Sequence, residues 1–176
     1  MKIILNSQYK PKLLFKKKVF YCQIGNNGLA TNFKKKEGDK CTPLGNWKLL
    51  KIFIKKDKKY FFKFNSCIKD MVKFFDKGIG WCDDDKSFYY NKLVNLNVKK
   101  EIKFSYEDFC RKDDVYDLVI VLDYNIKPTI KSKGSAIFIH CSFKDLRNTN
   151  GCVAIKKNNL KFIINNLQKI NYIYIR

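Results

Sequence analysis

The run of residues 117–123, DLVIVLD, places five consecutive apolar residues between two aspartates. A strand with one face in water alternates apolar and polar residues, whereas a strand covered on both faces reads as a continuous apolar run. We therefore predict a strand here that is buried on both faces. Such a strand needs a folded domain around it, and the composition agrees, because 45% of the residues are hydrophobic and 15% are aromatic.

Short strand-like runs of this kind dominate the chain. Trp, Ile and Phe favour β-structure in residues 47–54, and residues 60–64 resemble a partner strand for that run. Residues 2–6 and 19–24 are predicted to form an opening hairpin or strand pair. The other predicted strands are residues 135–140 (SAIFIH), 152–155 and 171–175.

Helices are few in this pattern. Residues 157–169 are predicted as an amphipathic helix, because apolar side chains recur at spacings of three and four. These are Leu160, Ile163, Ile164 and Leu167. Residues 107–111 are predicted as a short helix, and residues 78–97 as a long irregular connection of the kind that often carries function. The predicted fold class is mainly β with a few helices.

The chain is predicted to be one domain, residues 1–176, because no linker, repeat or low-complexity boundary divides it, and it is expected to be a monomer. Its net charge is +21, which attracts polyanions. Only Arg111, Arg147 and Arg176 among the 37 basic residues are arginines, and arginine is the better residue for bidentate phosphate or base contacts. We therefore expect no specific nucleic-acid site, whereas an acidic polymer such as the cell wall suits the charge.

The sequence predicts neither a transmembrane segment nor a clear signal peptide. No apolar run approaches the roughly 18 residues that a membrane-spanning helix needs. The first apolar runs, residues 3–5 and 13–15, are shorter than the roughly 7 to 15 residues of a secretory signal core.

The one histidine of the chain and a glycine-cysteine pair define the strongest candidate for chemistry. His140 closes an apolar strand, and Cys152 begins another one after the turn at residues 148–151. A nucleophilic cysteine needs a nearby base and two donors for an oxyanion. Gly151 allows an unusual backbone conformation, so the Gly151 and Cys152 amides are candidates for those donors.

Three other interpretations of the pair stay open at this level. In the first, His140 and Cys152 are ordinary buried strand residues, since free cysteine is often an unreactive residue of the core. Cys141 and Cys152 offer a disulfide, although an odd total of seven cysteines favours a mainly reduced set. A metal on His140, Cys141 and Cys152 lacks a fourth ligand and the usual spacings, and no C-x-x-C pair occurs.

Four ordered elements of the sequence resemble L,D-transpeptidases of the YkuD type, and the last of them consists of two segments. GSAIFIH and TNGCVAI are similar to the family's strand-closing histidine and its T/S-x-G-C element. The upstream segments EGDKCTPLGNWKL, GWCDDDKSFYYN and RKDDVYDLVIVLDYN are similar, in the same order, to three further family elements. The resemblance covers about residues 37–167. It departs from the commonest pattern at Asn150, where relatives usually carry histidine, and at Ala154, and the gap between histidine and cysteine is shorter.

The resemblance implies a fold and a set of roles. The fold is a YkuD-like β-sandwich or barrel with the amphipathic helix after the nucleophile. Cys152 is the implied nucleophile and His140 the base and then the acid, with the Cys141 carbonyl orienting the imidazole and the Gly151 and Cys152 amides holding the oxyanion. The implied substrate-binding residues are Arg111, Trp81, Tyr90, Asn91, Tyr124, Asn125 and Asn150. An ion pair with Asp113 or Asp114 is an equal alternative for Arg111.

The implied activity is a peptidoglycan L,D-transpeptidase that cross-links stem peptides through a thioester, without metal or cofactor, and that carbapenems acylate. L,D-carboxypeptidase or D-amino-acid exchange at the same site are alternatives, as are a non-catalytic peptidoglycan-binding module and a basic nucleic-acid-binding protein. Asp83 and Asp84 are candidates for contact with the substrate's amino group. The family implies the periplasm or cell envelope, while the lack of a clear signal peptide leaves the cytoplasm open.

Overall fold

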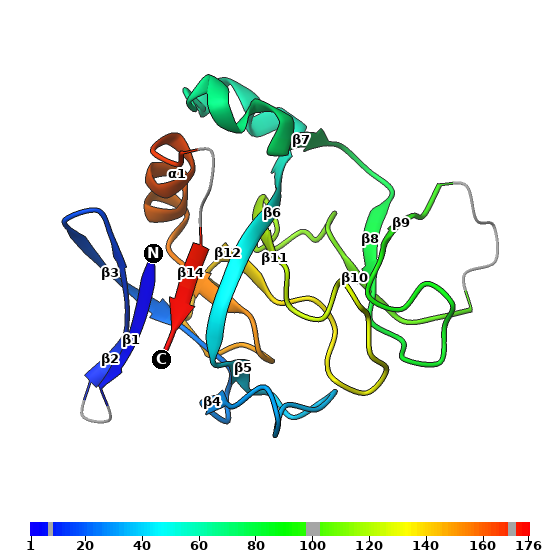
Figure 1. Cartoon of the computed structure of the whole chain (residues 1–176). Helices are drawn as coiled ribbons and strands as arrows, with labels where there is room; N and C mark the ends of the chain where they lie inside the picture. Colours follow the sequence, from blue (N-terminus) through cyan, green and yellow to red (C-terminus); the bar gives the residue numbers. More distant parts are fainter. Residues whose placement is uncertain (7–8, 98–102, 169–171) are drawn as a thin grey trace.

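The computed structural model describes residues 1–6, 9–97, 103–168 and 172–176, and nine of the strands described form two large sheets that share two strands. The first sheet runs in the order β3, β2, β1, β14, β6. The second runs β3, β13, β12, β11, β6, β7. Since β3 and β6 belong to both, the sheets join at two corners and enclose a core, as Figure 1 shows.

The bounds of these strands are β1 (Lys2–Asn6), β2 (Tyr9–Phe15), β3 (Lys18–Gln23), β6 (Gly45–Lys55), β7 (Val72–Phe75), β11 (Leu118–Leu122), β12 (Phe138–Cys141), β13 (Val153–Ile155) and β14 (Tyr172–Ile175). Two smaller sheets pair β4 (Leu29–Ala30) with β5 (Thr42–Pro43), and β8 (Ile79–Cys82) with β9 (Leu93–Asn95) and β10 (Tyr106–Asp108). The helices are η1 (Lys56–Phe61), η2 (Ser66–Met71) and α1 (Lys157–Asn165).

The strand predicted to be buried on both faces is β11, and this prediction is confirmed. Leu118, Ile120 and Leu122 contribute to one apolar core, which joins both large sheets to α1. Val119 and Val121 contribute to a second apolar cluster on the opposite face, beneath the small sheet of β8, β9 and β10. All five side chains are at most 1% exposed. The continuous apolar run therefore reflects a strand sandwiched between two cores.

Several other predictions are confirmed within a few residues. The predicted strands 2–6, 19–24, 47–54, 135–140, 152–155 and 171–175 correspond to β1, β3, β6, β12, β13 and β14, with residue 171 outside the described residues. The predicted amphipathic helix is α1, which buries Leu160, Ile163 and Ile164 against the sheet and ends at Asn165. Residue 169, the predicted end of that helix, also lies outside the described residues.

Four local predictions are wrong. Residues 60–64 form no strand: the chain turns through η1, and β6 instead pairs with β14, β11 and β7. Strands β1 and β3 do not pair directly, because β2 lies between them. Residues 107–111 begin in β10 rather than in a helix, because Tyr106, Glu107 and Asp108 pair with β8. The connection 78–97 is not irregular throughout, since it contains β8 and β9.

Truncation of the buried face of α1 tests the role of this helix in the core. Leu160 is fully buried, so Leu160→Ala is expected to lower the free energy of unfolding by about 2–5 kcal/mol. Asn158→Ala, at an exposed position of the same helix, is expected to change it by less than about 0.5 kcal/mol. Urea unfolding followed by circular dichroism measures both, and equal effects would contradict this packing.

Candidate active site

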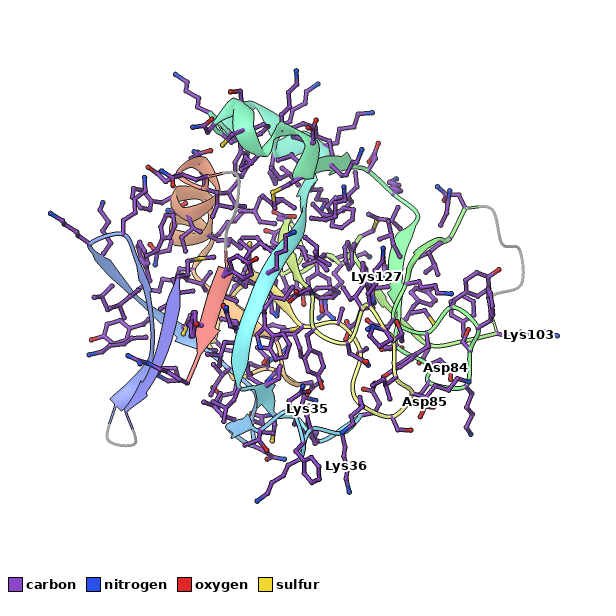
Figure 2. The ribbon with its side chains drawn as sticks, in the orientation of Figure 1. Lys35, Lys36, Asp84, Asp85, Lys103 and Lys127 are labelled. Carbon is purple, nitrogen blue, oxygen red and sulfur yellow. The ribbon has the colours of Figure 1, made fainter. Side chains whose placement is uncertain are left out.

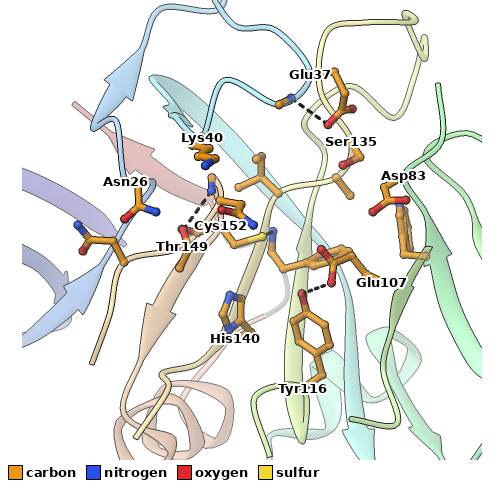
Figure 3. Close-up of a pocket in the computed structure, with 18 of the residues that line it drawn as sticks. Asn26, Glu37, Lys40, Asp83, Glu107, Tyr116, Ser135, His140, Thr149 and Cys152 are labelled. Carbon is orange, nitrogen blue, oxygen red and sulfur yellow. Dashed lines mark hydrogen bonds between the residues drawn. The ribbon is translucent and has the colours of Figure 1, made fainter. Parts of the chain in front are cut away.

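A pocket of about 500 Å³ brings His140 and Cys152 together, as Figure 3 shows. Strands β12 and β13 are parallel, with Ile139 opposite Val153 and His140 opposite Ala154. Cys152 directly precedes β13, so this register places it beside Phe138. Side chains two apart on a strand share a face, so Phe138 and His140 both point toward the pocket.

The imidazole of His140 is held in one orientation. Its Nδ1–H donates to the Cys141 carbonyl at 2.8 Å, because a carbonyl has no hydrogen to give. The ring of Tyr116 packs edge-on against it, with 5.3 Å between ring centroids. With Nδ1 carrying the proton, Nε2 is the acceptor atom of the ring. Burial lowers the pKa of His140 to about 4, so the imidazole is neutral at physiological pH.

The Cys152 thiol is neutral as well. Burial raises its pKa to about 12, an effect that the Phe138 amide opposes by donating its N–H to Sγ at 3.3 Å. The carboxylate of Glu107 raises the pKa further, and the ammonium of Lys35 lowers it. The pocket thus holds a neutral thiol near a neutral imidazole rather than a thiolate–imidazolium pair.

The turn before Cys152 needs glycine and is held by Thr149. Gly151 has a φ of +139°, and an added Cβ would lie 3.0 Å from the Cys41 carbonyl oxygen. Thr149 Oγ1 accepts from the Gly151 N–H at 3.1 Å and donates to the Cys152 carbonyl at 2.6 Å. Thr149 was not predicted from the sequence, although a hydroxyl residue two positions before a strained glycine is typical of such side-chain turns.

The arrangement corrects one expectation about the oxyanion donors. The Gly151 amide was expected to donate to an oxyanion, but its N–H is already bonded to Thr149. Within the described parts of the chain, the Cys152 amide has no hydrogen-bond partner. Cys152 N–H, which directly precedes β13, is therefore a backbone donor that this turn leaves available.

The substrate-binding candidates divide into two groups. Trp81, Arg111 and Asn150 line the pocket. Arg111 does so while its Nε donates to Asp113 at 3.0 Å, so the predicted ion-pair alternative is present. The other four candidates do not line this pocket. They are Tyr90, Asn91, Tyr124 and Asn125.

Two of these four brace the pocket wall from behind. Asn91 accepts from Trp81 Nε1 at 2.9 Å and donates to the Asn125 carbonyl. Tyr90 donates its hydroxyl to Glu37 at 2.6 Å, and Glu37 lines the pocket. Their contribution to the site is to hold Trp81 and Glu37 in place.

The other two lie at a second hollow, of about 670 Å³. Tyr124 packs edge-on against Trp47, with 5.0 Å between ring centroids, and donates its hydroxyl to the Lys133 carbonyl. Asn125 donates to the carbonyls of Ile130 and Gly134, so it secures the loop that leads to β12. Burial raises the pKa of the Tyr124 hydroxyl, which agrees with a packing residue.

Carboxylates gather on one side of the active pocket, although the chain has only 16 acidic residues. Glu37, Asp83 and Glu107 line it, each accepting a hydrogen bond from a neutral hydroxyl, and Asp84 does not line it. Glu107 and Tyr116, which donates to it, were not predicted from the sequence, because their roles depend on contacts made in the folded chain: β10, which carries Glu107, pairs with β8, and Tyr116 packs against His140. Glu37 is the first residue of the family-like segment EGDKCTPLGNWKL and was not itself predicted to be a site residue.

Cations also line the pocket, but three of them pair with other carboxylates. Lys35 pairs with Asp39, Arg111 with Asp113, and Arg147 with Asp145. Lys40 lies on the opposite side of the pocket from Asp83 and Glu107, as Figure 3 shows. Glu37, Asp83 and Glu107 therefore have no ion-pair partner among the described residues, and burial raises the pKa of the Glu107 carboxyl.

The remaining alternatives for Cys141 do not fit the strand geometry. Cys141 is adjacent to His140 in β12, so its side chain points to the opposite face, into the main core. All seven cysteines are free thiols. Among the described residues, no group of three or more His, Cys, Asp or Glu side chains is placed to hold a metal ion.

Comparison with known proteins places the chain in a family. The YkuD family model, the L,D-transpeptidase catalytic domain, matches residues 10–175. The chain belongs to the YkuD family. The predicted fold class is thereby confirmed, since the YkuD domain is a β-sandwich and this structure is mainly β. Comparison with curated proteins and with solved structures found no protein similar to this chain.

The YkuD family acts on peptidoglycan peptides and is usually associated with the cell envelope. In the part of the chain that the structure describes, no helix has the length and apolar character needed to cross a bilayer.

The raised pKa of Cys152 predicts how its alkylation depends on pH. Only the thiolate reacts, so the rate of carboxamidomethylation by iodoacetamide is expected to rise about tenfold per pH unit and to be still rising at about pH 10. Peptide mass spectrometry follows Cys152 separately from the other six thiols, and Cys152→Ala provides the blank. A plateau below about pH 8 would instead indicate a thiolate–imidazolium pair.

Proposed function

We propose that this YkuD domain is a peptidoglycan L,D-transpeptidase in which Cys152 is the nucleophile and His140 the general base. The observation that carries the proposal is the shared pocket, in which a neutral imidazole with a fixed tautomer lies near the thiol and the available Cys152 amide. A Cys–His pair with an oxyanion donor is the arrangement that acyl transfer requires. The family's action on peptidoglycan peptides supports the substrate class.

In the first half-reaction, the proton of Cys152 moves to His140 Nε2 as sulfur bonds to the carbonyl carbon of an L-residue that precedes a D-residue. The carbonyl oxygen becomes an oxyanion, which the Cys152 amide receives. As the C–N bond breaks, the protonated His140 gives its proton to the departing D-residue amine. A thioester on Cys152 remains.

The neutral resting pair has a consequence for this step. Because burial disfavours charge on both groups, proton transfer before a substrate binds is unfavourable. Charge separation becomes favourable only when a bound carbonyl accepts the sulfur's electrons and places the oxyanion at a donor. The site is thus protected from random thiol chemistry and is activated by its substrate.

In the second half-reaction, an amine of another stem peptide loses a proton to His140 and attacks the thioester. The new amide forms, the C–S bond breaks, and sulfur takes the proton back. Water as the acceptor gives an L,D-carboxypeptidase, and a free D-amino acid gives exchange. A YkuD fold that binds the wall without turnover is the non-catalytic alternative.

The carboxylates in the pocket favour an amine acceptor over water. Glu37, Asp83 and Glu107 line the pocket without an ion-pair partner among the described residues, in a protein of net charge +21. Asp83 and Glu107 are partly buried, and a partly buried carboxylate attracts an ammonium more strongly than a water-exposed one such as that of Glu37. The acceptor amine arrives protonated, so this side of the pocket raises its local concentration near the thioester, and the ammonium gives one proton to solvent before it attacks as a neutral amine.

The remaining assignments follow from the same site. Trp81, Arg111 and Asn150 form the wall against the stem peptide, with Asn150 in place of the histidine that relatives usually carry. The catalytic unit is the single domain 1–176, acting as a monomer at the cell envelope without metal or cofactor. No step of the reaction requires the many lysines outside the pocket, and their contribution is a general attraction to an acidic wall.

A carbapenem tests the nucleophile. Incubation is expected to give one adduct per chain by intact-mass spectrometry, absent in Cys152→Ala and at least about 100-fold slower in His140→Gln. Cys67→Ala, which removes an exposed thiol outside the pocket, is the matched control and is expected to react like wild type. No adduct together with no turnover of tetrapeptide muropeptides would refute the enzyme and favour a binding module.

Removal of single carboxylates tests the acceptor side. Asp83→Asn and Glu107→Gln are each expected to lower the ratio of cross-linked dimer to hydrolysed product by roughly threefold to tenfold, because they weaken attraction of the acceptor ammonium. Chromatography of muropeptide products measures this ratio. Asp57→Asn, in η1 and away from the pocket, is the charge-matched control. Ratios equal to wild type in both variants would contradict the acidic acceptor side.

A further inference from the structure

Thr42 lies behind the nucleophile turn, at a position that does not line the pocket. It belongs to β5, where its own amide donates to the Gly28 carbonyl at 2.9 Å, and its side chain is fully buried. A buried hydroxyl needs hydrogen-bond partners. The partners of this one connect two distant parts of the chain.

The Thr42 hydroxyl both accepts and donates. Oγ1 accepts from the Gly25 N–H at 2.9 Å and donates to the Gly151 carbonyl at 2.7 Å. A hydroxyl has a single proton, and the Gly25 amide can only donate. The two hydrogen bonds therefore run in one direction, from the Gly25 N–H to Thr42 Oγ1 and from the Thr42 hydroxyl to the Gly151 carbonyl.

The Gly151 carbonyl shares a peptide group with the Cys152 amide. The peptide bond is planar and trans, so its C=O and N–H point in opposite directions. A hydroxyl that holds the Gly151 oxygen on one side therefore turns the Cys152 N–H to the other side, away from Thr42. Thr149 holds the preceding amide, that of Gly151, by a separate hydrogen bond.

We propose that Thr42 is a positioning residue that aims the Cys152 N–H at the oxyanion through their shared peptide group. The inference rests on the proposed acyl transfer and adds a residue that nothing in the active pocket itself reveals. The hydrogen-bond chain also strengthens the donor, because a bond accepted by a peptide carbonyl polarises the N–H of the same peptide.

The surroundings of Thr42 leave the turn little freedom. Asp39 Oδ1 accepts from the Cys41 amide at 2.9 Å and from Lys35 Nζ at 2.8 Å, and Oδ2 accepts from the Lys36 amide at 2.8 Å. This loop sets the Cys41 carbonyl against Gly151. Figure 2 shows Lys35 and Lys36 on this loop; Lys35 is buried and Lys36 is exposed. These hydrogen bonds hold the loop before Thr42 in place, so the position of the Thr42 hydroxyl is well defined.

The experiment compares two reactions of the same sulfur. Alkylation of Cys152 by iodoacetamide forms no oxyanion, whereas acylation by a carbapenem does. Thr42→Val keeps the shape and removes the hydroxyl, so it is expected to slow acylation at saturating carbapenem by roughly 10- to 100-fold, with alkylation within about twofold of wild type. Thr42→Ser keeps the hydroxyl and is expected to restore acylation to within about threefold.

Thr129→Val is the matched control. It removes a hydroxyl that donates to the Ile126 carbonyl at 2.9 Å, outside the pocket, and is expected to leave both reactions unchanged. A merely structural role for Thr42 predicts that alkylation and acylation change together, and that result overturns the proposal. Acylation of Thr42→Val at the wild-type rate also overturns it.

A wild-type measurement covers the case in which Thr42→Val does not fold. Acylation by the carbapenem is expected to shift the amide proton resonance of Cys152 downfield by NMR, while that of Gly151, bonded to Thr149, moves little. The opposite pattern refutes the proposal. If wild type is neither acylated nor active on muropeptides, the proposed function fails, which is a different result from wild-type acylation that does not depend on Thr42.

Discussion

The parallel pairing of β12 with β13 is the interaction on which the site depends. The register of this pairing places Cys152 beside Phe138, on the strand next to the one that carries His140. Because side chains alternate along a strand, the Cys152 thiol and the His140 imidazole lie on the same face. Parallel pairing requires the chain to leave β12 and return in the same direction, and the connection 142–152 does so. That return ends in the glycine turn that presents the thiol.

Burial and hydrogen bonding act in opposite directions in this pocket. Burial keeps the thiol and the imidazole neutral, while hydrogen bonds from Nδ1 to Cys141 and from Phe138 to sulfur hold both groups in place. The pocket is therefore ordered before substrate arrives and carries little charge at its reacting atoms. Charge is found instead in the carboxylates and the paired cations that line the pocket.

Elements could be predicted from the sequence where local pattern and burial coincide. The DLVIVLD run, the strand ending at His140 and the helix face of Leu160 are of this kind, because each buries apolar side chains in a regular pattern. The predictions failed at residues 60–64 and 107–111, where aromatic and charged residues fit a strand and a helix equally well. Which of the two forms there depends on pairing with strands that lie elsewhere in the sequence.

The sequence by itself determined the fold class, the candidate histidine and cysteine, and the need for glycine at the turn, because these follow from residue chemistry and from short ordered motifs along residues 37–167. Only the tertiary structure decided which amide is available to an oxyanion, and which of the wall candidates reach the pocket. Those answers depend on contacts between distant segments, such as Thr42 with Gly151 and Tyr90 with Glu37. No local pattern encodes such contacts, because they exist only after the sheets have closed.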